Sequence, residues 1–182
     1  MKVSPHSVRR ATTADAAELA ALAERTFRET FAAANTAANM DEHCRRNYGE
    51  TIQAAEIVSQ SGVTLVAERD GLLVGYAHVR FDASTPSCVT GRLPGELQRL
   101  YVAGEYHGSG VAQALMAASL SALARHGCDV AWLGVWERNP RAIAFYLKLG
   151  FREVGEHVFQ LGADPQRDVV MVLPLQKPGS II

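Results

Sequence analysis

The segment His107–Ala112 has a composition suited to binding a phosphate group. It reads His-Gly-Ser-Gly-Val-Ala, between an apolar segment ending at Val102 and the start of a predicted helix. Glycines let the backbone approach phosphate oxygens closely, and the free N–H groups at a helix N-terminus favour an anion. A glycine turn that merely begins a helix would have the same composition, so the segment alone does not separate the two interpretations.

The spacing excludes two better-known phosphate-binding loops. A P-loop has a Lys directly after its last glycine, whereas Val111 follows Gly110. A dinucleotide-binding fingerprint has a third glycine where this chain has Gln113, and its acidic residue ends a strand. Asp129 lies at about the right distance but precedes its strand. We therefore interpret Asp129 as part of a turn.

Strands and helices alternate around this segment and would hold it in place. Glu96–Val102 and Val130–Trp136 are predicted strands, the second nearly all apolar, as in a central strand covered on both faces. A helix begins at the glycines between them. Asn139 and Pro140 open the next helix as N-cap and first helical residue, and Gly150 ends it.

The rest of the chain adds further elements on both sides of this unit. They are a strand at 8–11, a helix opened by Thr12 and Asp15, helical pieces at 41–48 and 51–59, strands from 62 and at 72–81 joined by Asp70-Gly71, a loop at 83–95, and strands at 151–155 and 168–175. This order predicts an α/β protein, with one mixed sheet and helices on its faces.

Size and composition predict a single globular domain over residues 1–182, with ragged ends at 1–7 and 176–182. The net charge of −1 gives no broad positive field for nucleic acid. The three cysteines are far apart, so we expect neither a disulfide nor a metal site, and a cytoplasmic location. No run of about 18 apolar residues is present, so we expect no membrane association.

Several motifs resemble those of the GNAT superfamily of N-acetyltransferases. Segment 100–112 resembles the family's Arg/Gln-x-x-Gly-x-Gly/Ala motif after a strand, with His107 at the Arg/Gln position. Asn139–Phe151 matches the more specific pattern Asn-x-x-Ala-x-x-Phe-Tyr-x-x-x-Gly-Phe. The likeness covers essentially the whole chain. Segments 133–137 and 159–168 further resemble the PaiA-type spermidine/spermine acetyltransferases.

The resemblance implies a twisted, mostly antiparallel sheet whose central strands splay apart, with acetyl-CoA in the gap and no metal. A backbone N–H near Val102 would polarise the thioester carbonyl. Histidine carries a charge only below about pH 6.5. Whether the His107 side chain contacts the pyrophosphate, as the family's Arg or Gln does, is therefore left undecided by the sequence. The cofactor-binding residues implied are Leu100, Tyr101, Val102, His107, Gly108, Ser109, Gly110, Val111, Ala112, Asn139, Phe145 and Tyr146.

Tyr146 aligns with the family's catalytic tyrosine, and we expect its phenol to have a shifted pKa or to donate a hydrogen bond that strengthens as charge builds on the departing sulfur of CoA. Tyr146 also shares a helical face with Phe145 and Leu149, so core packing is the alternative. A free alkylamine is mostly protonated at pH 7 and needs a proton acceptor before it can attack. Glu96, beside the cofactor strand, is the first candidate and Glu137 the second. Each would otherwise be a solvated surface charge.

The acceptor is the least determined part of the function. The first hypothesis is direct transfer, in a ternary complex, to a primary amine of a small molecule, a polyamine by the PaiA resemblance. The alternatives are a protein or peptide N-acetyltransferase and a non-catalytic acetyl-CoA-binding module. A homodimer is expected only from the family. We interpret His78 as a core residue and Arg141 and Lys148 as surface charges, with phosphate contacts of the two cations as the alternative.

Overall fold

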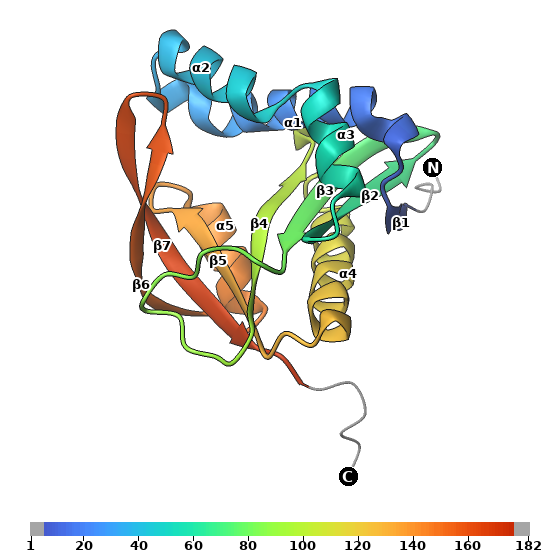
Figure 1. Cartoon of the computed structure of the whole chain (residues 1–182). Helices are drawn as coiled ribbons and strands as arrows, with labels where there is room; N and C mark the ends of the chain where they lie inside the picture. The colour runs from blue at the N-terminus through green and yellow to red at the C-terminus, as the bar shows by residue number, and fades with distance from the viewer. Residues whose placement is uncertain (1–5, 177–182) are drawn as a thin grey trace.

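The chain folds around one seven-stranded sheet with the strand order β1-β2-β3-β4-β5-β7-β6 (Figure 1). The computed structural model describes residues 6–176, so the ends expected to be ragged lie mostly outside the described residues. The strands are β1 (Ser7–Arg10), β2 (Gly62–Arg69), β3 (Leu72–Arg80), β4 (Pro94–Val102), β5 (Val130–Trp136), β6 (Arg152–Leu161) and β7 (Asp164–Pro174). The helices are α1 (Ala16–Phe31), α2 (Ala37–Asn47), α3 (Glu50–Val58), α4 (Val111–His126) and α5 (Pro140–Lys148).

The two central strands, β4 and β5, separate along their length. They pair in parallel only from Pro94↔Val130 to Glu96↔Trp132, whereas both strands continue beyond those residues. The register between β3 and β4 shifts between the pairs His78↔Arg99 and Val79↔Leu97, which leaves Gln98 as an extra residue. A bulge of this kind bends a strand and increases its local twist. The remaining strand pairs are antiparallel, so the predicted mostly antiparallel sheet with splayed central strands is confirmed.

Helices cover both faces of this sheet (Figure 1). Leu19 and Phe27 of α1 pack with Trp136 and with residues of α2 and the hairpin β2–β3. On the other face, Leu115 of α4 and Tyr146 of α5 belong to a second buried cluster. The loop of residues 81–93 packs Val89 against buried side chains of β5 and β7. The wedge, the gap where β4 and β5 separate, therefore lies between helices on the two faces of the sheet, and the loop packs near the end where the two strands still pair.

Local sequence explains where the helices nearest this wedge begin and end. Gly110 precedes α4 with a φ of 88°, and Gly127 follows the helix with a φ of 95°, a backbone region that favours glycine. Asn139 caps α5 through its Oδ1 atom, which accepts a hydrogen bond from the Ala142 N–H at 3.1 Å. Pro140 is the first residue of that helix. The helix starts predicted at the glycines and at Asn139 are confirmed.

Two segments differ from the sequence prediction. Helix α2 begins at Ala37 rather than near Asp41, because Thr36 caps it by accepting a hydrogen bond from the Asn39 N–H at 3.3 Å. Strand β6 continues to Leu161 and strand β7 already begins at Asp164, whereas the sequence predicted strands only at 151–155 and 168–175. Their outer halves carry many exposed polar residues, so the apolar alternation that identifies a strand is absent there.

None of the helices within residues 6–176 combines the length and the apolar character needed to cross a membrane. The three cysteines are free thiols, and Cys44 and Cys128 are buried. His78 is buried as expected, and its Nδ1 atom lies 2.8 Å from the Thr64 hydroxyl.

Candidate active site

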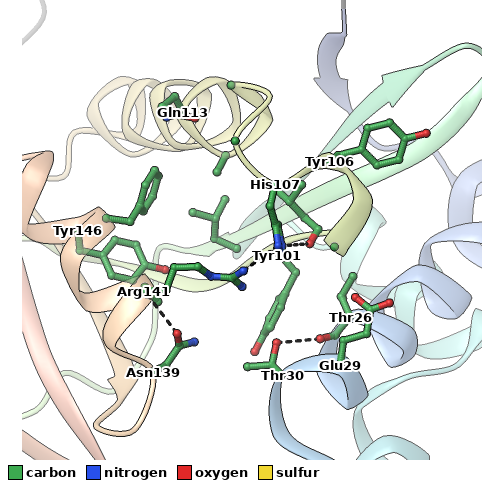
Figure 2. A pocket seen from close by; sticks show the side chains of 18 residues that line it. Thr26, Glu29, Thr30, Tyr101, Tyr106, His107, Gln113, Asn139, Arg141 and Tyr146 are labelled. Atoms are coloured by element: carbon green, nitrogen blue, oxygen red, sulfur yellow. Dashed lines mark hydrogen bonds between the residues drawn. The ribbon is translucent and has the colours of Figure 1, made fainter.

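A cavity of about 590 Å³ lies where the ends of β4, α5 and α1 meet the start of α4. Its walls include Leu100–Val102 of β4, the glycines of the loop before α4, and Tyr146 of α5. Figure 2 shows Tyr146 and Arg141 reaching into this space from one side, with His107 and Thr30 facing them. The cavity therefore lies on the β4 side of the wedge, between the end of β4 and α5.

The loop before α4 has the backbone geometry of an anion site. Gly108 and Gly110 line the cavity with positive φ values of 77° and 88°. The first N–H groups of α4 have no partner within the helix and can bind an anion. Ser109 instead donates its hydroxyl to the Tyr106 carbonyl at 2.6 Å, and Val111 is fully buried. These two predicted residues do not line the cavity.

His107 and Arg141 form a hydrogen-bonded pair at the same loop. The Arg141 Nη1 atom lies 2.7 Å from His107 Nδ1, and His107 Nε2 lies 2.9 Å from the Val102 carbonyl oxygen. A guanidinium only donates and a carbonyl only accepts, so this histidine is the neutral tautomer with its proton on Nε2. Both side chains line the cavity, and His107 thus holds a permanently charged guanidinium beside the glycines (Figure 2).

The end of β4 presents backbone donors to the wedge. The Ala103 N–H donates to the Val74 carbonyl at 2.9 Å and so points toward β3. Successive residues of a strand direct their N–H groups to opposite edges, so the Val102 and Leu100 N–H groups point toward the gap beside β5. A carbonyl group placed in the wedge could accept a hydrogen bond from the Val102 N–H, the contact that the family resemblance implies.

Tyr146 is one of three tyrosines that line the first cavity. It is only 9% exposed and lies edge-on to Phe145 and Phe151, with ring centroids 5.4 and 5.7 Å away. Burial raises the pKa of its hydroxyl above the usual value of 10. The phenol therefore stays protonated throughout the neutral range and remains available as a hydrogen-bond donor.

A second cavity, of about 240 Å³, adjoins the first on the face of the sheet that carries α1. The two cavities share wall residues from α1, β4 and α5. These shared residues are Thr30, Leu100, Tyr101, Asn139, Ala142 and Tyr146. Glu96 and Asp168 line only the second cavity, which also contains Arg99 and His157. The arrangement gives two compartments that meet at Tyr146.

Three carboxylates near the second cavity have different partners. Glu56 accepts a hydrogen bond from Arg99 at 2.8 Å, and Glu96 lies 3.8 Å from the Arg80 guanidinium. Burial raises the pKa of Glu96, while the positive charge of Arg80 opposes that shift. Asp168 pairs with no arginine or lysine in the part of the chain that the structure describes, and burial raises its pKa to about 7.

Most of the residues singled out from the sequence line one of the two cavities, and several other residues line them as well. Glu96 lies in the second cavity, whereas Glu137 lies outside both cavities and pairs with Arg167 at 2.8 Å. Thr26, Glu29 and Thr30 of α1 also line the first cavity. They are three of the polar residues within a predicted helix, and no spacing rule marked them as cavity residues.

Comparisons with known proteins agree with this geometry. Residues 18–151 match the acetyltransferase (GNAT) family. An uncharacterized N-acetyltransferase of Mycobacterium tuberculosis is 37% identical over 162 residues, covering 88% of this chain and 98% of that protein. The PaiA N-acetyltransferase of Thermoplasma acidophilum, solved in complex with coenzyme A, has a TM-score of 0.72 at 20% identity. That match covers 93% of this chain and 99% of the other.

A ribosomal-protein-alanine N-acetyltransferase of Brucella melitensis is also similar in structure. Its TM-score is 0.67 at 24% identity, and the match covers 93% of this chain and 99% of the other. The chain belongs to the GNAT family of acetyltransferases. It is an acetyl-CoA-dependent acetyltransferase, and the wedge between β4 and β5 is its candidate active site.

Proposed function

We propose that the protein transfers the acetyl group of acetyl-CoA directly to a primary amine of a small molecule, in a ternary complex. The observation that carries this proposal is the pair of adjoining cavities that share Tyr101, Asn139 and Tyr146. Acetyl-CoA in the first cavity and the acceptor in the second would meet at the shared wall. A covalent acetyl-enzyme is then unnecessary.

The residues of the first cavity fit acetyl-CoA. Glycines with positive φ at a helix N-terminus suit a pyrophosphate, and the edge of β4 with its free N–H groups suits the amides of the pantetheine arm. His107 is neutral in its hydrogen-bonded arrangement. We therefore assign the charged contact with the pyrophosphate to Arg141, with His107 as the residue that positions it.

Tyr146 would act on the leaving sulfur. The pKa of a free thiol is about 8.5 and that of a phenol about 10, and burial raises the phenol pKa further here. Complete proton transfer ahead of bond breaking would be uphill. We therefore propose that the Tyr146 hydroxyl donates a hydrogen bond that strengthens as negative charge builds on sulfur. The Val102 N–H would stabilise the carbonyl oxygen at the same time.

The second cavity supports a small cationic acceptor. At about 240 Å³ it lies below the range of about 300–1,000 Å³ typical of sites for drug-sized ligands. Its lining includes two carboxyl groups, Glu96 and Asp168. We propose that Glu96 contributes negative charge that attracts an amine bearing a second cationic nitrogen. Glu96 is also the predicted proton acceptor, a role that the pH–rate profiles of Glu96→Gln and Asp168→Asn can assign to one of these two carboxyl groups.

A panel of acceptors tests the proposed class. With acetyl-CoA and a thiol-detecting reagent, we expect release of CoA with diamines and polyamines and much lower rates with single amino acids. The Glu96→Gln variant should raise KM for a diamine more than for a monoamine of equal length, because it removes one anionic group. Turnover with N-terminal or lysine peptides alone would contradict the small-molecule proposal and favour a protein acceptor.

A further inference from the structure

Asp168 is a buried carboxyl group that forms no ion pair with an arginine or lysine within residues 6–176. It lies on β7 opposite Trp136 of β5 and His157 of β6, and the residue is 7% exposed. Its Oδ1 atom is buried and has no hydrogen-bond partner among the described residues, and the residue lines the second cavity. An unpaired buried carboxylate costs several kcal/mol of solvation free energy. The presence of Asp168 at this position therefore has a reason other than stability.

Gly134 allows His157 to pack close to this carboxyl group. A Cβ atom at Gly134 would lie 3.2 Å from Asp168 Oδ2 and 2.4 Å from His157 Nε2. No real side chain tolerates the second distance, so any larger residue on β5 would displace His157. The glycine therefore lets the His157 ring lie against β5 beside Asp168, in the wall of the second cavity.

The groups that face Asp168 leave it free to exchange a proton. From β6, His157 Nε2 lies 3.9 Å from Oδ2, too far for a hydrogen bond, and burial lowers the pKa of His157. From β4, the phenol of Tyr101 has a raised pKa, chiefly because it is buried and to a smaller degree because of the nearby Asp168 charge. The facing residues of β5 carry no charge. Arg99 and Glu96 are engaged with Glu56 and Arg80.

We infer that Asp168, rather than Glu96, accepts the proton of the acceptor ammonium. This inference rests on the proposed acetyl transfer to an amine. The nitrogen gives one proton to the Asp168 carboxylate and its lone pair forms the bond to the acetyl carbon, while the bond from that carbon to sulfur breaks. Tyr146 gives its proton to sulfur and recovers one from the nitrogen. Asp168 finally releases its proton to water.

The test compares Asp168→Asn with Glu96→Gln, two neutral replacements of similar shape in the same cavity. For wild type, log kcat should rise with pH on the acidic side as Asp168 loses its proton, with an inflection near pH 7. In Asp168→Asn we expect this acidic limb to disappear and kcat to fall about 100-fold, the lower range for loss of a general base. Glu96→Gln should keep the limb.

Two further readouts separate this role from a structural one. Asp168→Asn should bind CoA with wild-type affinity in calorimetry, because the residue lies outside the first cavity. Its Tm at pH 8 should exceed that of wild type, because a buried charge has been removed. If wild type instead has the higher Tm at pH 8, the Asp168 carboxylate stabilises the fold and its role is structural.

Retention of the acidic limb in Asp168→Asn, with only a higher KM for the acceptor, would overturn the inference. Loss of that limb in Glu96→Gln instead would return the proton-accepting role to Glu96. If only peptide amines are acetylated, the small-molecule proposal fails, but the same two pH profiles can be measured on the peptide. The two failures are therefore distinguishable.

Discussion

Replacement of Tyr146 by Phe should lower kcat by about 100-fold or more and leave the affinity for acetyl-CoA nearly unchanged. Tyr146 lines both cavities and is 9% exposed. The substitution removes one hydroxyl group and preserves the ring that packs against Phe145 and Phe151. Loss of a proton or hydrogen-bond donor in the transition state typically costs 10² to 10⁴ in rate.

Steady-state rates with acetyl-CoA, together with calorimetric titration of CoA, measure the two effects separately. Tyr106→Phe is a suitable control, because Tyr106 also lines the first cavity but lies in the loop before α4. Equal turnover of Tyr146→Phe and wild type would remove Tyr146 from the mechanism. The residue would then be a core side chain of α5, the alternative that its helical spacing left open.

Replacement of Arg141 by Gln should weaken CoA binding by about tenfold. A hydrogen bond to a charged group contributes about 1.5–3 kcal/mol, and the exposure of this pair reduces that value through screening by solvent and salt. Calorimetry with three compounds locates the contact. CoA and dephospho-CoA should lose affinity equally, whereas pantetheine, which lacks the pyrophosphate, should bind both proteins alike.

His107→Ala should produce part of the same loss, because it frees Arg141 to move. In a double-mutant cycle, the two substitutions should cost clearly less together than the sum of their separate effects. Lys148→Gln is the matched control, an exposed cation near the end of the same helix. A loss confined to CoA and absent with dephospho-CoA would instead place Arg141 at the 3′-phosphate.

Local sequence predicted the parts of the site that depend on backbone conformation. Glycines at 108 and 110 and the Asn139-Pro140 pair fix where α4 and α5 begin, whatever the rest of the chain does. The splayed strands were inferred from family resemblance, because no local pattern encodes the loss of pairing beyond Glu96. The bulge at Gln98 in particular has no signature in the residues around it.

Contacts between distant residues could not be predicted in this way. His107 and Arg141 are 34 positions apart, and their pairing depends on how α5 packs beside the loop. Asp168 did carry a signal, since it begins the apolar run Asp168-Val-Val-Met-Val-Leu of a predicted strand. A lone carboxylate at the edge of a buried strand is costly, but only the tertiary structure reveals that Asp168 faces a cavity whose arginine, Arg99, is already paired with Glu56.

The central claim is that acetyl-CoA and the acceptor occupy adjoining cavities at the same time and react directly at Tyr146. An initial-rate matrix, in which both substrate concentrations are varied, tests it most directly. We expect double-reciprocal lines that intersect, as required when both substrates must be bound before CoA leaves. Parallel lines, together with release of CoA in the absence of acceptor, would indicate an acetyl-enzyme intermediate and contradict the two-cavity account.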